Sequence, residues 1–224
     1  MVTRLYLVRH AEAEGNVKEF FQGNIDTDLT EKGRRQLDCL AERFRDIPIE
    51  VMYTSPFRRA LMTAEAVNRY HGLPLHKDFA LREINGGGWE GRTWAEIPTL
   101  YPHQYELWTQ KMHLFCAPCG DAMSNVYARM RNALTKIAQE NPGKTCAVVS
   151  HGCALRNFLC YAEFGRIDRL KDVGWSDNTA VSLVEYDGET GRWTLIFKND
   201  SSHLPPELST LRNSAWNRYE KEKS

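Results

Sequence analysis

Short apolar runs alternate with amphipathic stretches along most of the chain. Residues 3–9, 49–54 and 145–150 have the length and character of strands, and the last is almost continuously apolar, which is typical of a strand covered on both faces. Apolar residues recur at helical spacing over residues 31–46 and 121–140. This alternation predicts an α/β fold, a three-layer α/β/α sandwich with a largely parallel central sheet.

Turn signals and further periodicity extend this pattern. Ser55 followed by Pro56 is typical of a helix N-cap and first helical position, which predicts a helix through about Tyr70. The other expected elements are a strand near residues 75–80, a helix directly after His151, and a hairpin formed by residues 179–186 and 192–198.

Two segments depart from the alternation. Residues 84–120 contain several tryptophans and the pair Cys116 and Cys119, and we interpret them as a small cap inserted into a single catalytic α/β domain of residues 1–200. The polar tail, residues 201–224, is expected to be partly helical and to pack loosely. One Cys-x-x-Cys without a second pair does not predict a zinc site, so the role of these cysteines stays open.

Composition narrows the classes of function. The 224 residues carry 29 Lys and Arg against 29 Asp and Glu, so bulk charge gives no reason to bind nucleic acid or an anionic membrane. No apolar run approaches a spanning helix, and the N-terminal stretch, broken at Arg4 and ended at Arg9, is too short for a signal peptide. We therefore expect a cytoplasmic protein whose six cysteines are thiols.

Chemically distinctive residues follow three of the predicted strands. The first strand ends at Arg9 and His10. The second runs into the segment that contains Arg59, and the third ends at His151 and Gly152. Ligands of open α/β sheets bind beyond the carboxyl ends of the strands, where helix N-termini add N–H donors. Two histidines and two arginines at that edge predict a site for a doubly charged anion, most simply a phosphoryl group.

Phosphoryl transfer at such a site needs a nucleophile and an acid. A neutral imidazole can attack phosphorus and form a covalent intermediate, while arginine side chains hold the phosphoryl oxygens. The leaving oxygen needs a proton from a carboxylic acid opposite the nucleophile. Glu83, at the start of the cap, can supply it, with Glu12 and Glu90 as competing carboxylates.

Around these residues the sequence resembles the histidine phosphatase superfamily, which is also called phosphoglycerate-mutase-like. The resemblance covers about residues 4–187, and Asn178-Thr179 fits it as well. It rests on five blocks in the family's order: LVRHAEAEGN (7–16), FQG with DLTEKG (21–33), SPFRRALMTAE (55–65), LREINGGGWEG (81–91) and VVSHG (148–152).

The resemblance implies a role for residues in each block. His10 would be the nucleophile that becomes a phosphohistidine, and Glu83 would be the proton donor. Arg9, Arg59 and His151 would bind the phosphoryl group. The further substrate-binding residues that the resemblance implies are Asn16, Gln22 and Gly152. The family needs neither a metal nor another cofactor.

The sequence departs from the family pattern at three positions. Ala11 stands where glycine is usual after the histidine, Ala13 replaces a common threonine, and Gly86 stands where relatives often have an aromatic residue. We expect the glycine run that begins at Gly86 to be flexible and the pocket wall beside it to be open. The alignment of the third block selects Arg59 in preference to Arg58 as the phosphoryl ligand.

The resemblance implies a metal-independent phosphomonoester hydrolase acting on a small phosphorylated metabolite, similar to broad-specificity and α-ribazole phosphatases. One alternative is a cofactor-dependent phosphoglycerate mutase, although the residues after Glu83 lack the Glu-Arg-His-Tyr-Gly typical of mutases. Another is a phosphoryl-binding module without catalysis. The sequence leaves the oligomeric state open.

Apolar residues near these blocks bear on the substrate. They either wall the pocket, which would suit an organic or aromatic body such as a nucleotide-like phosphate, or form the core of the cap. These residues are Phe20, Phe21, Ile25, Trp89, Trp94 and Trp108.

Overall fold

The computed structural model describes residues 1–213 of the 224, and the charged end of the tail, expected to be helical, lies outside them. Its strands are β1 (Val2–Arg9), β2 (Val51–Thr54), β3 (Leu75–Lys77), β4 (Thr145–Ser150), β5 (Val181–Asp187) and β6 (Arg192–Asp200). Its α-helices are α1 (Glu14–Val17), α2 (Glu31–Phe44), α3 (Arg58–Val67), α4 (Ile97–Leu100), α5 (Pro102–Gln110), α6 (Met123–Glu140), α7 (Gly152–Phe164) and α8 (Thr210–Asn213).

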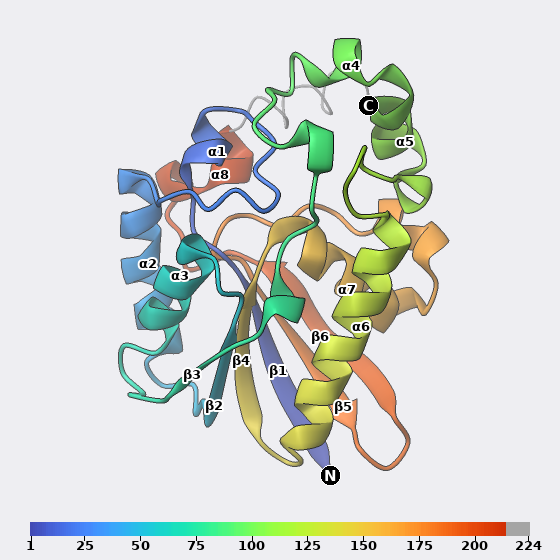
Figure 1. The fold of residues 1–224 in the computed structure, drawn as a ribbon. Helices are drawn as coiled ribbons and strands as arrows, with labels where there is room; N and C mark the ends of the chain where they lie inside the picture. Colours follow the sequence, from blue (N-terminus) through green and yellow to red (C-terminus); the bar gives the residue numbers. More distant parts are fainter. Residues whose placement is uncertain (214–224) are drawn as a thin grey trace.

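The strands form one sheet in the order β3-β2-β4-β1-β5-β6, with β4 and β1 at its centre (Figure 1). The strands from β3 to β1 pair in parallel, whereas β5 pairs antiparallel with both β1 and β6. Only antiparallel neighbours can be joined by a tight turn, and β5 and β6 form the expected hairpin. The predicted α/β fold with a largely parallel sheet is confirmed.

Helices cover both faces of the sheet, which makes the three layers (Figure 1). Successive side chains of β4 point to opposite faces. Cys146 and Val148 belong to the core under α6 and α7. Ala147 and Val149 belong to the core under α2 and α3. Every residue of β4 is therefore buried, as its continuous apolar run predicts.

Residues next to the helix ends determine where two of the helices that cover the sheet, α2 and α7, begin and end. Thr30 caps α2, because its hydroxyl accepts a hydrogen bond from the backbone N–H of Gly33. Leu37, Leu40 and Phe44 then lie on the buried face of that helix. At the other end of the chain, α7 stops at Gly165, whose φ of 69° suits a residue without Cβ.

Helix α3 starts later than the sequence predicts. Its N-cap is Phe57, so the prediction that Ser55 and Pro56 open the helix is wrong. The backbone N–H of Ser55 donates to the carbonyl of Val149 at 3.0 Å and so continues the pairing of β2 with β4. Its hydroxyl lies 2.7 Å from a ring nitrogen of His151 instead of capping a helix.

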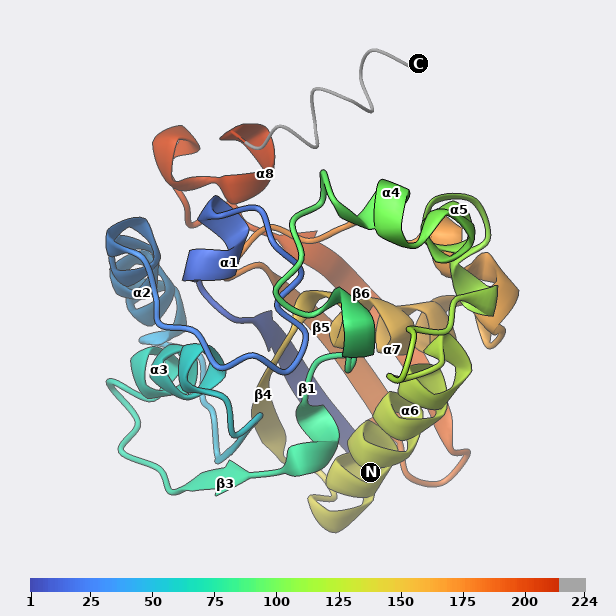
Figure 2. The same ribbon diagram turned by 45° about the horizontal axis from the view of Figure 1, so that its top comes forward.

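Residues 84–120, which we expect to be a cap, contain α4 and α5 and lie beyond the carboxyl ends of the strands (Figures 1 and 2). This segment is tied to residues 19–21, because the N–H of Phe21 donates to the carbonyl of Arg92 at 2.9 Å. The N–H of Trp94 likewise donates to Glu19 at 3.0 Å. The cap is thereby fixed to the loop that follows α1.

The glycine run that begins at Gly86, within the expected cap, is tightly packed, so the expectation of an open wall there is wrong. A Cβ at Gly86 would lie 2.4 Å from a ring carbon of Phe21. A Cβ at Gly87 would lie 2.0 Å from the carbonyl oxygen of Pro118, and its φ of +51° also favours glycine. Glycine is required at both positions, because neighbouring groups occupy the space that a larger side chain would need.

The tail also packs more closely than expected, as far as residue 213. Leu208 and Ser209 are buried. The Gln36 side chain on α2 donates to the carbonyl of Leu208 at 2.8 Å, and the N–H of Thr210 donates to Asp177 at 2.7 Å. Both ribbon views place α8 beside α1 (Figures 1 and 2).

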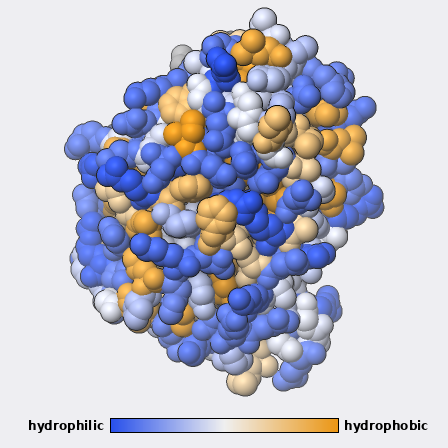
Figure 3. Space-filling model, viewed as in Figure 1, coloured by the Kyte–Doolittle hydropathy of each residue, from blue (hydrophilic) through white to orange (hydrophobic). Residues whose placement is uncertain are grey.

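The face seen in Figure 3 is largely hydrophilic, with small separate hydrophobic patches. Phe79, Leu100 and Leu114 are among the large apolar residues that are exposed. Within residues 1–213, no helix is long and apolar enough to cross a membrane.

Candidate active site

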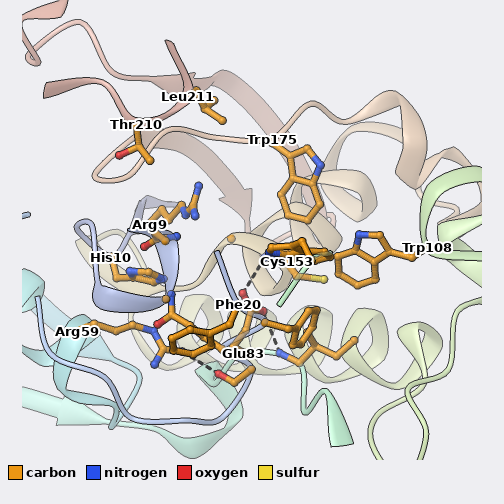
Figure 4. Close-up of a pocket in the computed structure, with 18 of the residues that line it drawn as sticks. Arg9, His10, Phe20, Arg59, Glu83, Trp108, Cys153, Trp175, Thr210 and Leu211 are labelled. Atoms are coloured by element: carbon orange, nitrogen blue, oxygen red, sulfur yellow. Dashed lines mark hydrogen bonds between the residues drawn. The ribbon is translucent and has the colours of Figure 1, made fainter. Parts of the chain in front are cut away.

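The carboxyl ends of β1, β2 and β4 meet at one edge of the sheet, as predicted. The register pairs Arg9 with Ser150. His10 and His151 follow the two central strands, and their ring centroids lie 5.2 Å apart. A cavity of about 400 Å³ opens at this edge, and Figure 4 shows Arg9, His10 and Arg59 together on one side of it.

His10 has a defined orientation and protonation state. Its Nδ1 lies 2.7 Å from the carbonyl oxygen of Ala11, and since a carbonyl only accepts, Nδ1 carries the proton. Burial, followed by the charges of Arg59 and Arg9, keeps the pKa of His10 well below its ordinary value. The ring is therefore neutral near pH 7, and Nε2 has a lone pair that can attack phosphorus.

His151 is fully buried beside His10, at the inner end of the cavity. Its Nε2 lies 2.7 Å from the Ser55 hydroxyl. Burial, followed by the charge of Arg59, holds the pKa of His151 well below its ordinary value, so this ring is neutral as well.

Two arginines are fixed by backbone carbonyls. Arg59 is 1% exposed, and its two terminal nitrogens donate to Ile25 and Gly23, both at 2.8 Å. Arg9 donates in the same way to the carbonyl of Ser176. Burial lowers the pKa of Arg59 to about 10, which leaves the guanidinium charged at neutral pH.

Three buried nitrogen atoms near His10 have no hydrogen-bond partner within residues 1–213, and all three are donors when the Ser55 hydroxyl donates to Nε2 of His151. They are Nε of Arg9, Nε of Arg59 and Nδ1 of His151. Buried polar groups are normally paired, and a group of unpaired ones needs an explanation. The oxygens of a bound phosphoryl group are acceptors of the kind that these donors fit.

Glu83 is the carboxylate that lines the cavity. Its Oε2 accepts from the N–H of Cys153 at 3.0 Å, and its Oε1 accepts from Ala154 and Ile84, both at 2.9 Å. Cys153 and Ala154 are in the first turn of α7, where backbone N–H groups have no partner within the helix and are free to bind the carboxyl group. The helix that follows His151 therefore also fixes the carboxylate.

The two competing carboxylates have structural partners and do not line the cavity. Glu12 is buried and accepts from the Thr30 hydroxyl at 2.7 Å. Glu90 accepts from the backbone N–H groups of Asn24 and Gly86, at 2.8 and 3.0 Å, and so links two loops. The geometry favours Glu83 for chemistry.

The predicted binding residues Asn16 and Gln22 both line the cavity. The side-chain oxygen of Asn16 accepts from the N–H of Ala13 at 3.0 Å. The side-chain oxygen of Gln22 accepts from the Thr27 hydroxyl at 2.6 Å. These bonds fix the orientation of each amide.

Gly152 also lines the cavity, and it has a steric role. A Cβ at this position would lie 3.2 Å from Nε of Arg9, so the glycine lets the guanidinium lie against the first turn of α7. Arg58, in contrast, is exposed and pairs with Asp28 at 3.1 Å. The structure thus brings Arg59 to the site and not Arg58.

The rest of the cavity wall is apolar. Phe20, Phe21, Trp94 and Trp108 line it, whereas Trp89 is fully buried behind it and Ile25 is not part of the wall. Sequence reasoning missed further lining residues, which are Gly15, Gly23, Ile84, Cys153, Gly174, Trp175, Thr210 and Leu211. The sequence offers a signal for several of them, since Cys153 directly follows the predicted Gly152, three others also adjoin predicted residues, and Trp175 lies close to Asn178-Thr179.

A neutral histidine between two buried arginines, with a carboxylate on the adjoining helix, defines the class of a phosphoryl-transfer enzyme. A sequence model of the histidine phosphatase superfamily (branch 1) matches residues 5–200. This is most of the chain, and the chain belongs to that superfamily. The prediction of a histidine phosphatase is confirmed.

Relatives of known name cover nearly the whole chain. Phosphoserine phosphatase 1 of Hydrogenobacter thermophilus is 29% identical over 203 residues, which are 91% of this chain and 95% of that protein. "Probable phosphoglycerate mutase GpmB" of Cronobacter sakazakii is 32% identical over 224 residues, 93% and 99% of the two chains. The solved structure of YhfR from Bacillus stearothermophilus superposes with a TM-score of 0.85 at 34% identity, covering 90% and 98%.

Proposed function

We propose that this enzyme hydrolyses phosphomonoesters of small metabolites through a phosphohistidine at His10. The observation that carries the proposal is the hydrogen bond from Nδ1 of His10 to the Ala11 carbonyl. It leaves the unprotonated Nε2 as the nucleophilic atom, next to buried donors of Arg9 and Arg59 that have no other partner within the described residues. The phosphatase name of a relative that matches 91% of the chain supports it.

In the first step, Nε2 of His10 forms a bond to phosphorus as the bond from phosphorus to the leaving oxygen breaks. Glu83, in its protonated form, gives its proton to that oxygen, so the alcohol leaves neutral. Arg9, Arg59 and Nδ1–H of His151 hold the other phosphoryl oxygens as their charge redistributes.

In the second step, the Glu83 carboxylate removes a proton from a water molecule, and the water oxygen bonds to phosphorus. The bond from phosphorus to Nε2 breaks and the electron pair returns to the imidazole. The products are inorganic phosphate, a neutral His10 and a protonated Glu83, which restores the starting state.

Trapping the intermediate tests the proposal. After mixing with p-nitrophenyl phosphate and quenching in alkali, the peptide that contains His10 should gain the mass of one phosphoryl group. His10→Ala should abolish both this mass and turnover, and Glu83→Gln should let the phosphohistidine accumulate because its hydrolysis loses the base. Glu14→Gln is the matched control, because this carboxylate is partly exposed, pairs with Lys18 and does not line the cavity. Turnover by His10→Ala would refute the mechanism.

The mutase is the second candidate, because a relative at 32% identity has that name. A mutase returns the phosphoryl group from His10 to a hydroxyl of the substrate and not to water. Incubation with 3-phosphoglycerate and a bisphosphoglycerate primer separates the two activities. We expect no 2-phosphoglycerate, and any phosphoryl group that leaves 3-phosphoglycerate should appear as free phosphate.

A further inference from the structure

The cavity has two chemically different ends. In Figure 4, Arg9, His10 and Arg59 lie on one side, and Trp108 and Trp175 lie on the other. The apolar residues of the lining are Phe20, Phe21, Ile84, Trp94, Trp108, Trp175 and Leu211. A phosphoryl group held at His10 would therefore direct the alcohol part of a monoester toward apolar side chains.

The rings of the apolar end are held in place by one another. Trp108 stacks on Trp175 with centroids 6.1 Å apart and ring planes 28° apart. Phe21 packs its edge on Trp108 at 5.5 Å. The guanidinium carbon of Arg156 lies 4.4 Å from the Trp175 ring, and its Nε donates to Val173. A ligand that contacts these rings does not have to order them first, which favours binding.

The charged residues of the cavity lining belong to the phosphoryl end, and Arg156, against the Trp175 ring, is not part of the lining. Among the residues of the described chain that line the cavity, those with a formal charge are Arg9, Arg59 and Glu83. A substrate carboxylate placed among the aromatic rings would lose water without gaining a cation, which is costly. A planar apolar group there would instead bury its surface against aromatic faces and edges, which is favourable.

We infer that the enzyme selects phosphate monoesters whose alcohol part is uncharged and carries a planar, apolar ring. The inference rests on the proposed function and names the substrate class of that same site. It separates this chain from enzymes whose substrates bear a carboxylate next to the phosphate. The cavity volume of about 400 Å³ lies in the range of small-molecule sites.

Three primary-alcohol monoesters test the substrate class with similar leaving groups: propyl phosphate, 3-phenylpropyl phosphate, and propyl phosphate with a terminal carboxylate. We expect kcat/KM for the phenylpropyl ester to exceed that for the propyl ester by about tenfold to a hundredfold. The carboxylated ester should be the poorest of the three. Equal values for the phenylpropyl and propyl esters, or a preference for the carboxylated one, would overturn the inference.

A variant pair ties the preference to the aromatic end of the cavity. Trp175→Leu should lower the ratio of kcat/KM for phenylpropyl over propyl phosphate by about tenfold, because it removes the ring that stacks on Trp108. Tyr70→Leu changes an exposed aromatic residue outside the cavity and should leave the ratio unchanged. An unchanged ratio in Trp175→Leu, with the protein folded by circular dichroism, contradicts the assignment.

The outcomes also distinguish this inference from the proposed function. If none of the three esters is hydrolysed and no phosphohistidine forms, the proposed function fails. If all three are hydrolysed through a phosphohistidine but without the expected order, only the substrate class fails.

Discussion

At the scale of single residues, Ser55 shows how one side chain can have a role that its local sequence conceals. Ser-Pro before an amphipathic run is typical of a helix start. The Ser55 hydroxyl instead lies 2.7 Å from Nε2 of His151, a residue 96 positions away. When that hydroxyl donates to Nε2, the proton of the neutral ring is on Nδ1, the buried atom proposed to face the phosphoryl group.

Removing this hydroxyl should therefore impair catalysis more than stability. In Ser55→Ala the His151 ring can place its proton on either nitrogen, and we expect kcat to fall about tenfold to a hundredfold, less than on loss of a direct oxyanion donor. Thr54→Val is the control, because it removes a buried hydroxyl bonded to a backbone carbonyl and not to His151. A similar loss of kcat in both variants would contradict the role of Ser55.

At the scale of elements, α6 positions the segment that carries Glu83. Nη1 of Arg129 donates to the carbonyls of Ala80 and Arg82 at 2.6 and 2.7 Å, and Nη2 donates to that of Glu83 at 3.3 Å. The first turn of α7 holds the carboxylate itself. Two helices thus fix the backbone and the side chain of the proposed acid.

Arg129 is in this sense a positioning residue. The effect of its substitution on turnover should therefore depend on the leaving group of the substrate. In Arg129→Met, turnover of alkyl phosphates should fall about tenfold or more, because an alkoxide needs the proton of a well-placed Glu83. Turnover of p-nitrophenyl phosphate should fall much less, since p-nitrophenolate leaves without a proton. Arg131→Met, on the exposed side of α6, is the control. An equal loss on both kinds of substrate would indicate a structural role only.

The elements differ in how far the sequence predicts them. The strands can be predicted because each is a short run of apolar residues. The ends of β1 and β4 can be predicted because His10 and His151 follow those runs directly in the sequence. Thr63 of the third block links two of these blocks in space, since it accepts from the N–H of Ala11 and donates to the carbonyl of Arg59. The bond to Ala11 is tertiary and has no local signal, and the same is true of the contact between Ser55 and His151, which accompanies the later start of α3.

At the scale of the whole molecule, the same limit applies to the cavity wall. Thr210 and Leu211 line the cavity, and Asp177 holds them there by accepting hydrogen bonds from both of their N–H groups, at 2.7 and 3.2 Å. A polar tail gives no periodic pattern from which this contact could be predicted. The glycine run at Gly86 was misjudged for a related reason, since its packing against Phe21 depends on a distant segment.

His203 joins the tail to the body of the protein. Its Nδ1 lies 3.1 Å from Nη1 of Arg43, and its Nε2 lies 3.1 Å from the Thr179 hydroxyl. Since arginine only donates, Nδ1 must be unprotonated. Burial, followed by the charge of Arg43, lowers the pKa of His203 to about 4.

Buried neutral histidines make the stability of the whole molecule depend on pH. The unfolded chain binds a proton at each histidine below about pH 6.5, whereas His10, His151 and His203 stay neutral when folded. The unfolded state then binds more protons, so the free energy of unfolding should fall as pH drops from about 6.5 toward 4, by up to about 1.4 kcal/mol per pH unit and histidine. Urea denaturation at about pH 7, 6 and 5 measures this slope. His203→Gln should make this slope against pH shallower, whereas His76→Gln, at an exposed histidine, should leave it unchanged. Equal slopes in the wild type and His203→Gln would contradict the assignment of His203 as a buried neutral histidine.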